Sequence, residues 1–256
     1  MFKVATWNVN SIRVRLLQVL DWLHVVKPDL LALQEIKADD ENFPVAEFRD
    51  RGYQVLCNGQ KTYNGVAIIC SYTPKNIITD FPEYEDPQRR LLYASFDNFS
   101  VINIYVPNGS ETGSDKFKYK LEWLSRLQLF VNNKLKTDSN LLVMGDFNIA
   151  PADEDVHDPD EWRGKVLVSG PERKHFSQLI DKGLVDCFRL LNQGNDKYSW
   201  WDYRGSGFAR NRGLRIDHIL ASETLSKSCK SSYIDTSPRG LERPSDHAPV
   251  VAEFNL

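Results

Sequence analysis

Cysteine is scarce in this sequence, and its placement argues against two classes of protein. The four cysteines are far apart and no two form a C-x-x-C pair: Cys57, Cys70, Cys187 and Cys229. Such spacing indicates neither a zinc ribbon nor a disulfide framework. Free thiols in a reducing compartment are the simple interpretation.

Long apolar runs and linkers are lacking too. No apolar stretch approaches the roughly 20 residues that a helix needs to cross a bilayer. The first residues, "MFKVATWNVN", contain no basic segment followed by a long apolar one. We therefore expect a cytoplasmic protein with no membrane partner. Repeats, low-complexity tracts and Gly/Ser-rich linkers are also absent, which predicts a single domain over residues 1–256.

The composition is that of a globular protein with a slight excess of acid. Apolar residues make up 41%, charged residues make up 26%, and the net charge is -3. These values allow a sizeable core and argue against wholesale disorder. They also argue against a protein that coats nucleic acid by bulk charge. A polyanionic partner would have to be held by a local basic patch or through metal ions.

Strands and helices are mixed along the chain. Apolar spacing predicts a helix capped by Ser11 and ended by Pro28, and further helices at 116–136 and 173–183. Apolar runs predict strands at 2–8, 29–35, 65–71, 91–97, 99–108, 141–148, 198–203, 215–222, 231–236 and in the C-terminal run after Pro249. Many strands with few outer helices favour an α/β sandwich of two packed sheets. No G-x-G-x-x-G follows an early strand, which disfavours a Rossmann fold.

Polar side chains stand at one end of six apolar strands. Four early strands finish with them and two late strands begin with them; in chain order the residues are Asn8, Glu35, Tyr105, Asn108, Asp146, Asn148, Asp217, Asp246 and His247. If the late strands run antiparallel to the early ones, all of these groups meet at one edge. Four clustered carboxylates would repel one another unless a cation sat among them or protons were shared. An oxygen-rich set without sulfur favours Mg²⁺ or Mn²⁺ over Zn²⁺.

Each motif taken alone has a structural alternative. "SDHAP" and "GDFN" could be ordinary turns, as could Asn8 and Asn10. Tyr105 could be a rim aromatic. The other histidines have no evident partner and are interpreted as structural or exposed: His24, His157, His175 and His218. The acidic segment 153–161, "DEDVHDPDE", lacks the ligand pattern of an EF-hand and is interpreted as a solvated loop.

Taken together, the motifs resemble those of a known family. "TWNVNSIR", "LQEIKA", "IYVPNG", "MGDFNIAP", "RIDHILAS" and "SDHAPV" follow the order found in exonuclease III-like AP endonucleases, within the endonuclease/exonuclease/phosphatase superfamily. The likeness covers Thr6 to Val250. It implies a four-layered α/β sandwich, with two packed mixed β-sheets flanked by helices. It also implies a monomeric DNA-repair enzyme that uses Mg²⁺ or Mn²⁺ to cleave double-stranded DNA 5′ to abasic (AP) sites. Such enzymes also act on blocked 3′ ends as 3′-phosphodiesterases and 3′→5′ exonucleases.

The resemblance further implies a role for each residue at the strand ends. Glu35 is the principal metal ligand, Asn8 supports it, and Asp246 is a candidate ligand for a second ion. Asp146 activates or positions the attacking water, and Asn148 orients the same group or the phosphate. His247 contacts a phosphate oxygen and is held by Asp217. The remaining residues contact the phosphate or its surroundings: Tyr105, Asn108 and Asn10.

Substrate choice is assigned by the same resemblance to a second group of residues. An aromatic and two apolar residues, Trp200, Leu214 and Ile216, form a pocket for an extrahelical sugar that lacks its base. One of the two tryptophans at 200–201 is expected to be core. Phosphate contacts are expected from basic residues: Arg204, Arg210, Arg212, Arg215, Lys116, Lys118 and Lys120.

Two other functions remain open on these motifs. The same fold could hydrolyse another phosphoester, as a general nuclease like DNase I or as a lipid or inositol phosphatase; "NRGLRID" and the Trp200 region disfavour this. The chain could also be a catalytically silent DNA- or protein-binding module. The intact set of polar residues at the strand ends disfavours that second alternative.

Overall fold

The structure is a computed structural model that describes residues 1–84, 86–191 and 194–255. The α-helices are α1 (Ile12–Val26), α2 (Val45–Arg49), α3 (Asp115–Leu135), α4 (Pro159–Trp162), α5 (Gly170–Asp181), α6 (Cys187–Leu190) and α7 (Glu223–Ser226). The strands are β1 (Phe2–Asn8), β2 (Leu30–Gln34), β3 (Gln54–Asn58), β4 (Val66–Cys70), β5 (Asn76–Ile78), β6 (Leu91–Ser95), β7 (Ser100–Tyr105), β8 (Leu141–Asp146), β9 (Leu184–Asp186), β10 (Trp200–Trp201), β11 (Gly213–Leu214), β12 (Asp217–Ser222), β13 (Cys229–Ile234) and β14 (Val250–Phe254).

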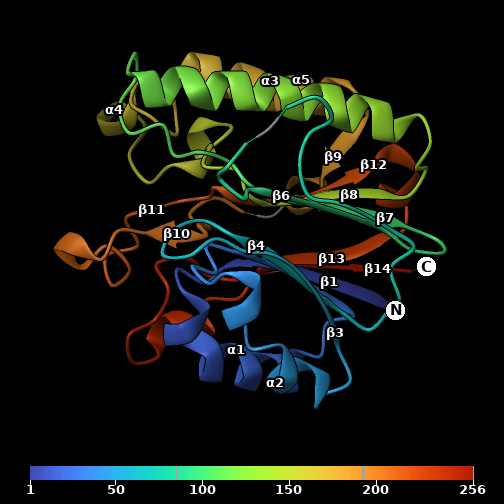
Figure 1. The fold of residues 1–256 in the computed structure, drawn as a ribbon. Helices are drawn as coiled ribbons and strands as arrows, with labels where there is room; N and C mark the ends of the chain where they lie inside the picture. The colour runs from blue at the N-terminus through green and yellow to red at the C-terminus, as the bar shows by residue number, and fades with distance from the viewer. Residues whose placement is uncertain (85, 192–193, 256) are drawn as a thin grey trace.

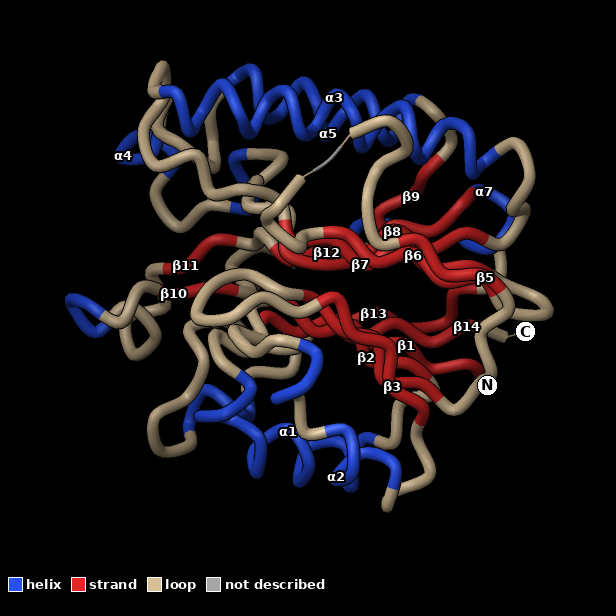
Figure 2. Tube along the Cα trace, viewed as in Figure 1, coloured by secondary structure: helices blue, strands red, loops and turns tan. Residues whose placement is uncertain are grey.

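Two six-stranded sheets lie face to face, with helices on both outer faces (Figures 1 and 2). The first sheet has the order β13-β14-β1-β2-β4-β3, and the second has the order β5-β6-β7-β8-β12-β9. Helices α1 and α2 cover the first sheet, and α3 and α5 cover the second. Parallel pairs join β1 to β2 and β7 to β8, whereas the neighbouring pairs in both sheets are antiparallel. The predicted four-layered sandwich with mixed sheets is therefore confirmed.

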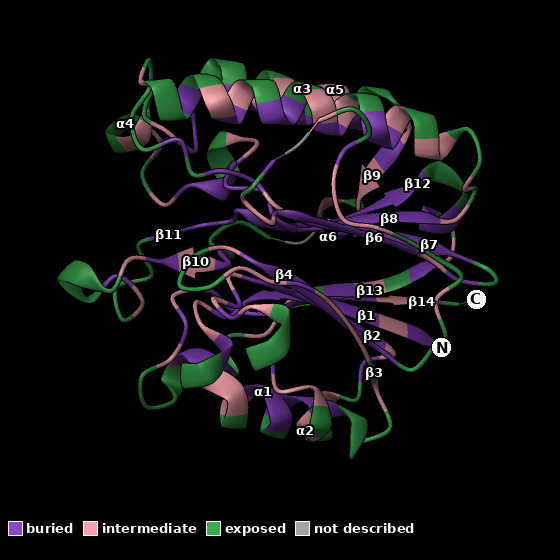
Figure 3. Cartoon of the chain, viewed as in Figure 1, coloured by how far each residue is buried: buried purple, intermediate pink, exposed green. Residues whose placement is uncertain are grey.

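The sheets are buried on both faces, which explains their nearly continuous apolar sequences. Alternate residues of each strand pack between the two sheets, and the others pack under the helices (Figure 3). In β1, for example, Val4 lies in the central cluster and Ala5 in the cluster under α1. Among the helices of the described residues, none combines the length and apolar character needed to cross a bilayer.

The late strands run in the direction that the sequence pattern required. Strand β12 is antiparallel to β8, with Asp217 opposite Asp146, and β14 is antiparallel to β1. Because β7 and β8 are parallel and in register, Tyr105 also lies opposite Asp146. The C-terminal ends of the early strands and the N-terminal ends of the late ones therefore meet at a common edge.

The start of α1 differs from its prediction. Ser11 precedes the helix but makes no side-chain cap hydrogen bond, and its φ is 95°. The first amides are satisfied by the main chain instead: Ser11 N donates to Glu35 O and Ile12 N donates to Ile36 O. The predicted Ser11 cap is wrong, because the segment after β2 supplies the acceptors. This pairing fixes the segment 10–12 against the residues around Glu35.

Several predicted strands are shorter than expected; the one at 99–108, for example, spans only Ser100–Tyr105. The strand predicted at 198–203 is reduced to Trp200–Trp201, and the one predicted at 215–222 begins at Asp217. Ser199 Oγ accepts hydrogen bonds from the amides of Ile216 and Asp217, both at 3.0 Å. A side chain therefore supplies the acceptor where the chain enters β12, whose first residue is Asp217.

Candidate active site

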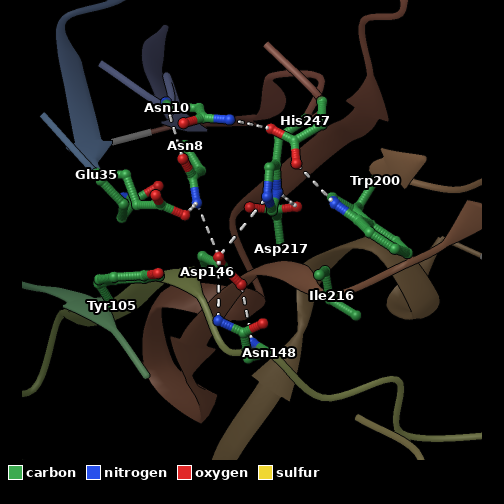
Figure 4. A network of polar contacts seen from close by, with 12 residues as sticks. Asn8, Asn10, Glu35, Tyr105, Asp146, Asn148, Trp200, Ile216, Asp217 and His247 are labelled. Atoms are coloured by element: carbon green, nitrogen blue, oxygen red, sulfur yellow. Dashed lines mark hydrogen bonds and ion pairs between the residues drawn. The ribbon is translucent and has the colours of Figure 1, made fainter. Parts of the chain in front are cut away.

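The predicted polar groups converge at one edge of the sandwich, and both sheets contribute (Figure 4). One potential ligand atom from each of Glu35, Asp146 and His247 lies within 4.8 Å of the other two. These residues follow β2, end β8 and precede β14, respectively. The convergence predicted from strand directions is therefore confirmed, whereas the role of each side chain stays a prediction.

The glycine before Asp146 allows β8 to approach its neighbour. Gly145 has a φ of +146°, and a Cβ at this position would lie 2.0 Å from the carbonyl oxygen of Ile104 in β7. Any side chain would push the two strands apart at the site. The close approach sets Asp146 opposite Tyr105 in the register.

His247 is held between two aspartates. Its Nδ1 lies 2.9 Å from Asp217 Oδ2, and its Nε2 lies 3.8 Å from Asp146 Oδ2. Its carbonyl oxygen accepts a hydrogen bond from Trp7 Nε1 at 3.2 Å. The hydrogen bond to Asp217 orients the ring so that Nε2 faces the cluster.

Burial and charge together shift the pKa values of these groups. Burial opposes the charged form of His247, but Asp217 and Asp146 raise its pKa to about 10. Burial is also the main cause that raises the pKa of Asp146, and the negative charge of Asp217 adds to it. Burial, followed by the charge of Glu35, raises the pKa of Tyr105 well above its usual value. At neutral pH the site thus holds an imidazolium and a neutral phenol.

The raised pKa of His247 predicts a pH-dependent stability. Below the ordinary histidine pKa of 6.5 the folded and unfolded states both carry the proton, so the stabilisation by His247 is complete. Between 6.5 and about 10 only the folded state keeps the proton, so the stabilisation declines as pH rises. We expect the difference in unfolding free energy between wild type and His247→Gln to shrink over this window, measured by urea denaturation. A difference that stays constant across the window would contradict the shift.

Asn8 bridges the two carboxylates nearest to it. Its Nδ2 donates to Glu35 Oε1 and to Asp146 Oδ2, both at 2.9 Å. Its Oδ1 accepts from the amide of Asn10 at 3.0 Å. The side-chain nitrogen therefore faces the acids, and a role for Asn8 as supporting metal ligand stays a prediction.

Asp246 lies beside this cluster and is already hydrogen-bonded. One carboxylate oxygen accepts from Asn10 Nδ2 at 2.9 Å, and the other accepts from Trp200 Nε1 at 3.0 Å. The pair of contacts links the strand end at Asn10 to the aromatic residue assigned to the sugar pocket. A role for Asp246 as ligand of a second ion stays a prediction.

Lys37 is a site residue that the sequence reasoning missed. Its Nζ lies 3.0 Å from Glu35 Oε2 and donates to Asn10 Oδ1 at 2.5 Å. The only signal in the sequence is its place two residues after the glutamate in "QEIKA". The ammonium offsets the charge of the carboxylate that is the best candidate metal ligand.

The phosphate-side residues form a second set of contacts. Asn148 donates its amide N–H to Asp146 Oδ1 at 2.8 Å, and Asn108 Nδ2 donates to Asn148 Oδ1 at 3.2 Å. The guanidinium of Arg90 lies 4.5 Å from the centre of the Tyr105 ring. Arg90, which sequence reasoning also missed, therefore helps to orient the ring of this tyrosine through a cation–π contact.

The residues assigned to the sugar pocket are together but covered. Leu214 and Ile216 are 0% and 1% exposed, within an apolar cluster that Trp162, Val166 and Trp200 border. The expected apolar grouping is present, yet both aliphatic side chains are buried within it. Trp201, by contrast, is core, as expected for one of the pair.

Two of the predicted phosphate contacts are wrong. The side chain of Lys120 is 0% exposed and pairs with Glu172, and that of Arg215 is 2% exposed and pairs with Asp155 and Asp186 at 2.7 and 2.8 Å. Because both side chains form buried ion pairs, neither can contact DNA.

The other basic side chains remain near the surface. Arg212 is 48% exposed and contacts Glu161, Arg204 pairs with Asp202, and Lys118 pairs with Asp115. Arg210 is exposed. Lys116 lines a cavity of about 490 Å³ that adjoins Arg90 and Asn108. These residues keep their predicted role as phosphate contacts, and Lys116 shares its cavity with Asn108.

The acidic segment 153–161 is not simply a solvated loop. Asp155 is 1% exposed, and its Oδ1 accepts a hydrogen bond from Arg215 Nε at 2.7 Å. His157 also has a partner, since Arg212 Nε lies 3.3 Å from its Nε2. His218 is fully buried, and its Nε2 lies 2.9 Å from the carbonyl oxygen of Ile149. These partners come from distant parts of the chain, which is why the sequence did not reveal them.

A four-layered sandwich with an acid and histidine cluster at its strand ends defines the class of protein. The chain belongs to the endonuclease/exonuclease/phosphatase family, whose model matches residues 5–247. The motif resemblance is thereby confirmed.

Individual relatives cover the whole chain. It is 41% identical to exodeoxyribonuclease III of Haemophilus influenzae, over 98% of this chain and 99% of that one. It is similar in structure to a Neisseria 3′ phosphatase bound to a product DNA hairpin, with 45% identity, a TM-score of 0.97 and full coverage of both chains. An AP endonuclease from Archaeoglobus fulgidus gives 39% identity and a TM-score of 0.95, again with full coverage of both chains.

Proposed function

We propose that this protein is a metal-dependent DNA-repair phosphodiesterase. It cleaves double-stranded DNA 5′ to abasic sites, and it acts on 3′ ends as a 3′-phosphodiesterase and 3′→5′ exonuclease. The observation that carries the proposal is the cluster of Glu35, Asp146 and His247, whose ligand atoms lie within 4.8 Å of one another. The names of the full-length relatives support the substrate class.

The donor set fits a hard divalent cation. Glu35 and Asp146 offer carboxylate oxygens, and no thiol is near them among the described residues that could hold a metal. Oxygen ligands favour Mg²⁺, with Mn²⁺ as the alternative. Glu35 would be its main ligand, with Asn8 beside it and Asp246 available to a second ion. When bound, the cation stabilises the negative charge that develops on the phosphoryl oxygens.

Asp146 is suited to take the proton of the attacking water. Its Oδ1 is fixed by the amide of Asn148, which leaves Oδ2 facing the cluster. Burial raises the pKa of this carboxylate, which makes it a stronger base than an exposed aspartate. Asn148 and Tyr105 lie next to it, and we assign them to the phosphate during attack.

His247 is suited to neutralise charge on a non-bridging phosphate oxygen. Phosphoryl transfer spreads charge over these oxygens in the transition state. A cationic imidazole fixed by Asp217 meets that charge without reorganising, which is the efficient form of electrostatic stabilisation. Asn108 and Asn10 border the same space and are assigned to substrate binding.

Selection of damaged DNA is assigned to the region around Trp200. An abasic nucleotide lacks a base to unstack, so turning it out of the helix costs little. We assign its sugar to the apolar cluster of Leu214 and Ile216, which are buried and border Trp200. We assign Arg212, which is 48% exposed, to a neighbouring phosphate. We expect the protein to act as a single-domain monomer in the cytoplasm.

One assay tests this function. Duplexes carrying a single tetrahydrofuran abasic analogue, a 3′-phosphate end or no damage are offered with Mg²⁺ and with EDTA. We expect incision on the 5′ side of the analogue and removal of the 3′ phosphate, with both activities abolished by EDTA. Equal cutting of undamaged duplex would indicate a general nuclease, and binding without cutting would indicate a silent module. Either result would overturn the proposal.

A further inference from the structure

A buried ion pair lies behind the active site, between α3 and α5. Lys120 of α3 contacts Glu172 of α5, and both side chains are 0% exposed. Burying two charges costs several kcal/mol of desolvation for each ion unless the geometry and further hydrogen bonds offset it. A pair that is only a tie between two helices does not need charge, since apolar side chains would serve at lower cost.

The remaining hydrogen bonds of Lys120 go to the active-site loops. An ammonium has three donors. Besides Glu172, Lys120 Nζ donates to the main-chain carbonyls of Asn148 at 2.7 Å and Asn108 at 3.1 Å. These two asparagines are the ones assigned to the phosphate side of the site, and their side chains bond to each other at 3.2 Å. One cation thus holds two loops that follow β7 and β8.

Glu172 fixes a third segment in the same way. Its Oε1 accepts from the amide of Leu167 at 3.0 Å, and its Oε2 accepts from the amide of Ser169 at 3.1 Å. Leu167 has a φ of 76°, which is uncommon for a residue with a side chain, and its carbonyl accepts from Ala150 N. This segment packs against Leu214 in the apolar cluster.

The local backbone near Asp146 needs such support. Asn148 has a φ of 49° and donates its amide N–H to Asp146 Oδ1 at 2.8 Å. The left-handed conformation is uncommon at residues other than glycine, although asparagine adopts it more readily than most, and hydrogen bonds to the neighbouring backbone hold it in place. The hydrogen bond from Lys120 to the Asn148 carbonyl is one such restraint, and it acts two residues from Asp146.

We propose that the Lys120–Glu172 pair is a positioning device for phosphodiester hydrolysis. It sets the loops of Asn108 and Asn148 against Asp146, so Lys120 is a positioning residue that touches neither DNA nor metal. The inference rests on the proposed function for its kinetic test. The alternative is a purely structural pair whose loss affects folding and leaves the site of the folded protein unchanged.

A set of variants separates these two roles. Lys120→Met leaves Glu172 as an unpaired buried charge, and Glu172→Gln does the same to Lys120. The double variant Lys120→Met/Glu172→Gln removes both charges, so it should recover stability relative to either single variant. We expect kcat of the double variant to stay about 10- to 100-fold below wild type with KM changed by less than about threefold, because the two carbonyls still lack their donor.

Gln128→Leu is the matched control. Gln128 of α3 donates to the carbonyl of His175 and to Gln178 Oε1 on α5, at 3.0 and 2.9 Å. It therefore joins the same two helices without contacting the site loops. We expect it to lower Tm while leaving kcat unchanged. If the double variant regains the kcat of wild type together with its stability, the positioning role is refuted.

Hydrogen–deuterium exchange supplies a readout that does not depend on activity. Peptides covering 105–110 and 146–150 should exchange faster in the double variant than in wild type. In Gln128→Leu their exchange should be the same as in wild type. Unchanged exchange of these peptides in the double variant would overturn the inference. A wild-type protein that cuts no duplex would refute the proposed function instead, and the exchange measurement would still decide on the ion pair.

Discussion

Replacing Asp146 by Asn should lower kcat on the abasic duplex by about 10²-fold or more, with little change in DNA affinity. The amide keeps the size of the carboxylate and can still accept from the amide of Asn148 at Oδ1. It cannot take a proton from water at neutral pH. Because proton transfer is needed only in the chemical step, the loss should appear in kcat rather than in binding. Single-turnover rates of cleavage measure the chemical step, and a titration of DNA binding to the variant measures the affinity.

Asp97→Asn is the matched control for this substitution. Asp97 is exposed, pairs with Lys75 and follows the end of β6 that pairs with Ser100, whereas Tyr105 of the site lies at the other end of β7. The control should retain the kcat of wild type. If kcat of Asp146→Asn stays within about threefold of wild type, Asp146 takes no part in the chemical step.

His247→Gln should produce the second large effect, a loss of about 10²- to 10³-fold in kcat. Glutamine can still donate a hydrogen bond, but it carries no charge to meet the phosphoryl oxygens. The pKa of His247, raised to about 10, means that wild type keeps this charge at neutral pH. Rates of incision measured with saturating DNA test the expectation, and His24→Gln, on the exposed face of α1, is the control.

The partner of His247 allows a sharper test. Asp217→Asn should also lower kcat, because Asp217 Oδ2 orients the ring through Nδ1. The double variant should then be no slower than His247→Gln alone, since the two residues act as a unit. Losses that multiply in the double variant would instead show that Asp217 acts independently of the imidazole.

The convergence of the site could be predicted because it depends on strand direction alone. Apolar runs that end or begin with polar residues reveal which strand ends carry the chemistry. The antiparallel pairing of Asp217 with Asp146 was a condition of that prediction, and the structure shows that it holds although a long stretch of chain separates the two strands. The sequence motifs added the family and its expected roles, and the family match bears out the former.

Buried charges could not be predicted in the same way. Lys120 and Arg215 lie in segments with other basic residues, and lysine and arginine side chains are usually exposed. Their partners Glu172 and Asp155 lie 52 and 60 residues away, so only packing reveals the pairs. The same holds for Leu214 and Ile216, whose cover by Trp162 and Val166 depends on how the loop after β8 returns over them.

The sequence by itself determined which side chains stand at the strand ends, and it predicted a shared edge for Glu35, Asp146 and His247 on the condition that the late strands run antiparallel to the early ones. Hydrophobic periodicity and turn residues are local features, so the sequence alone reveals them. Tertiary structure decided which charges remain available to a substrate and which are consumed inside the protein. That outcome depends on desolvation and on the reach of distant partners, and both exist only once the helices α3 and α5 have packed onto the second sheet.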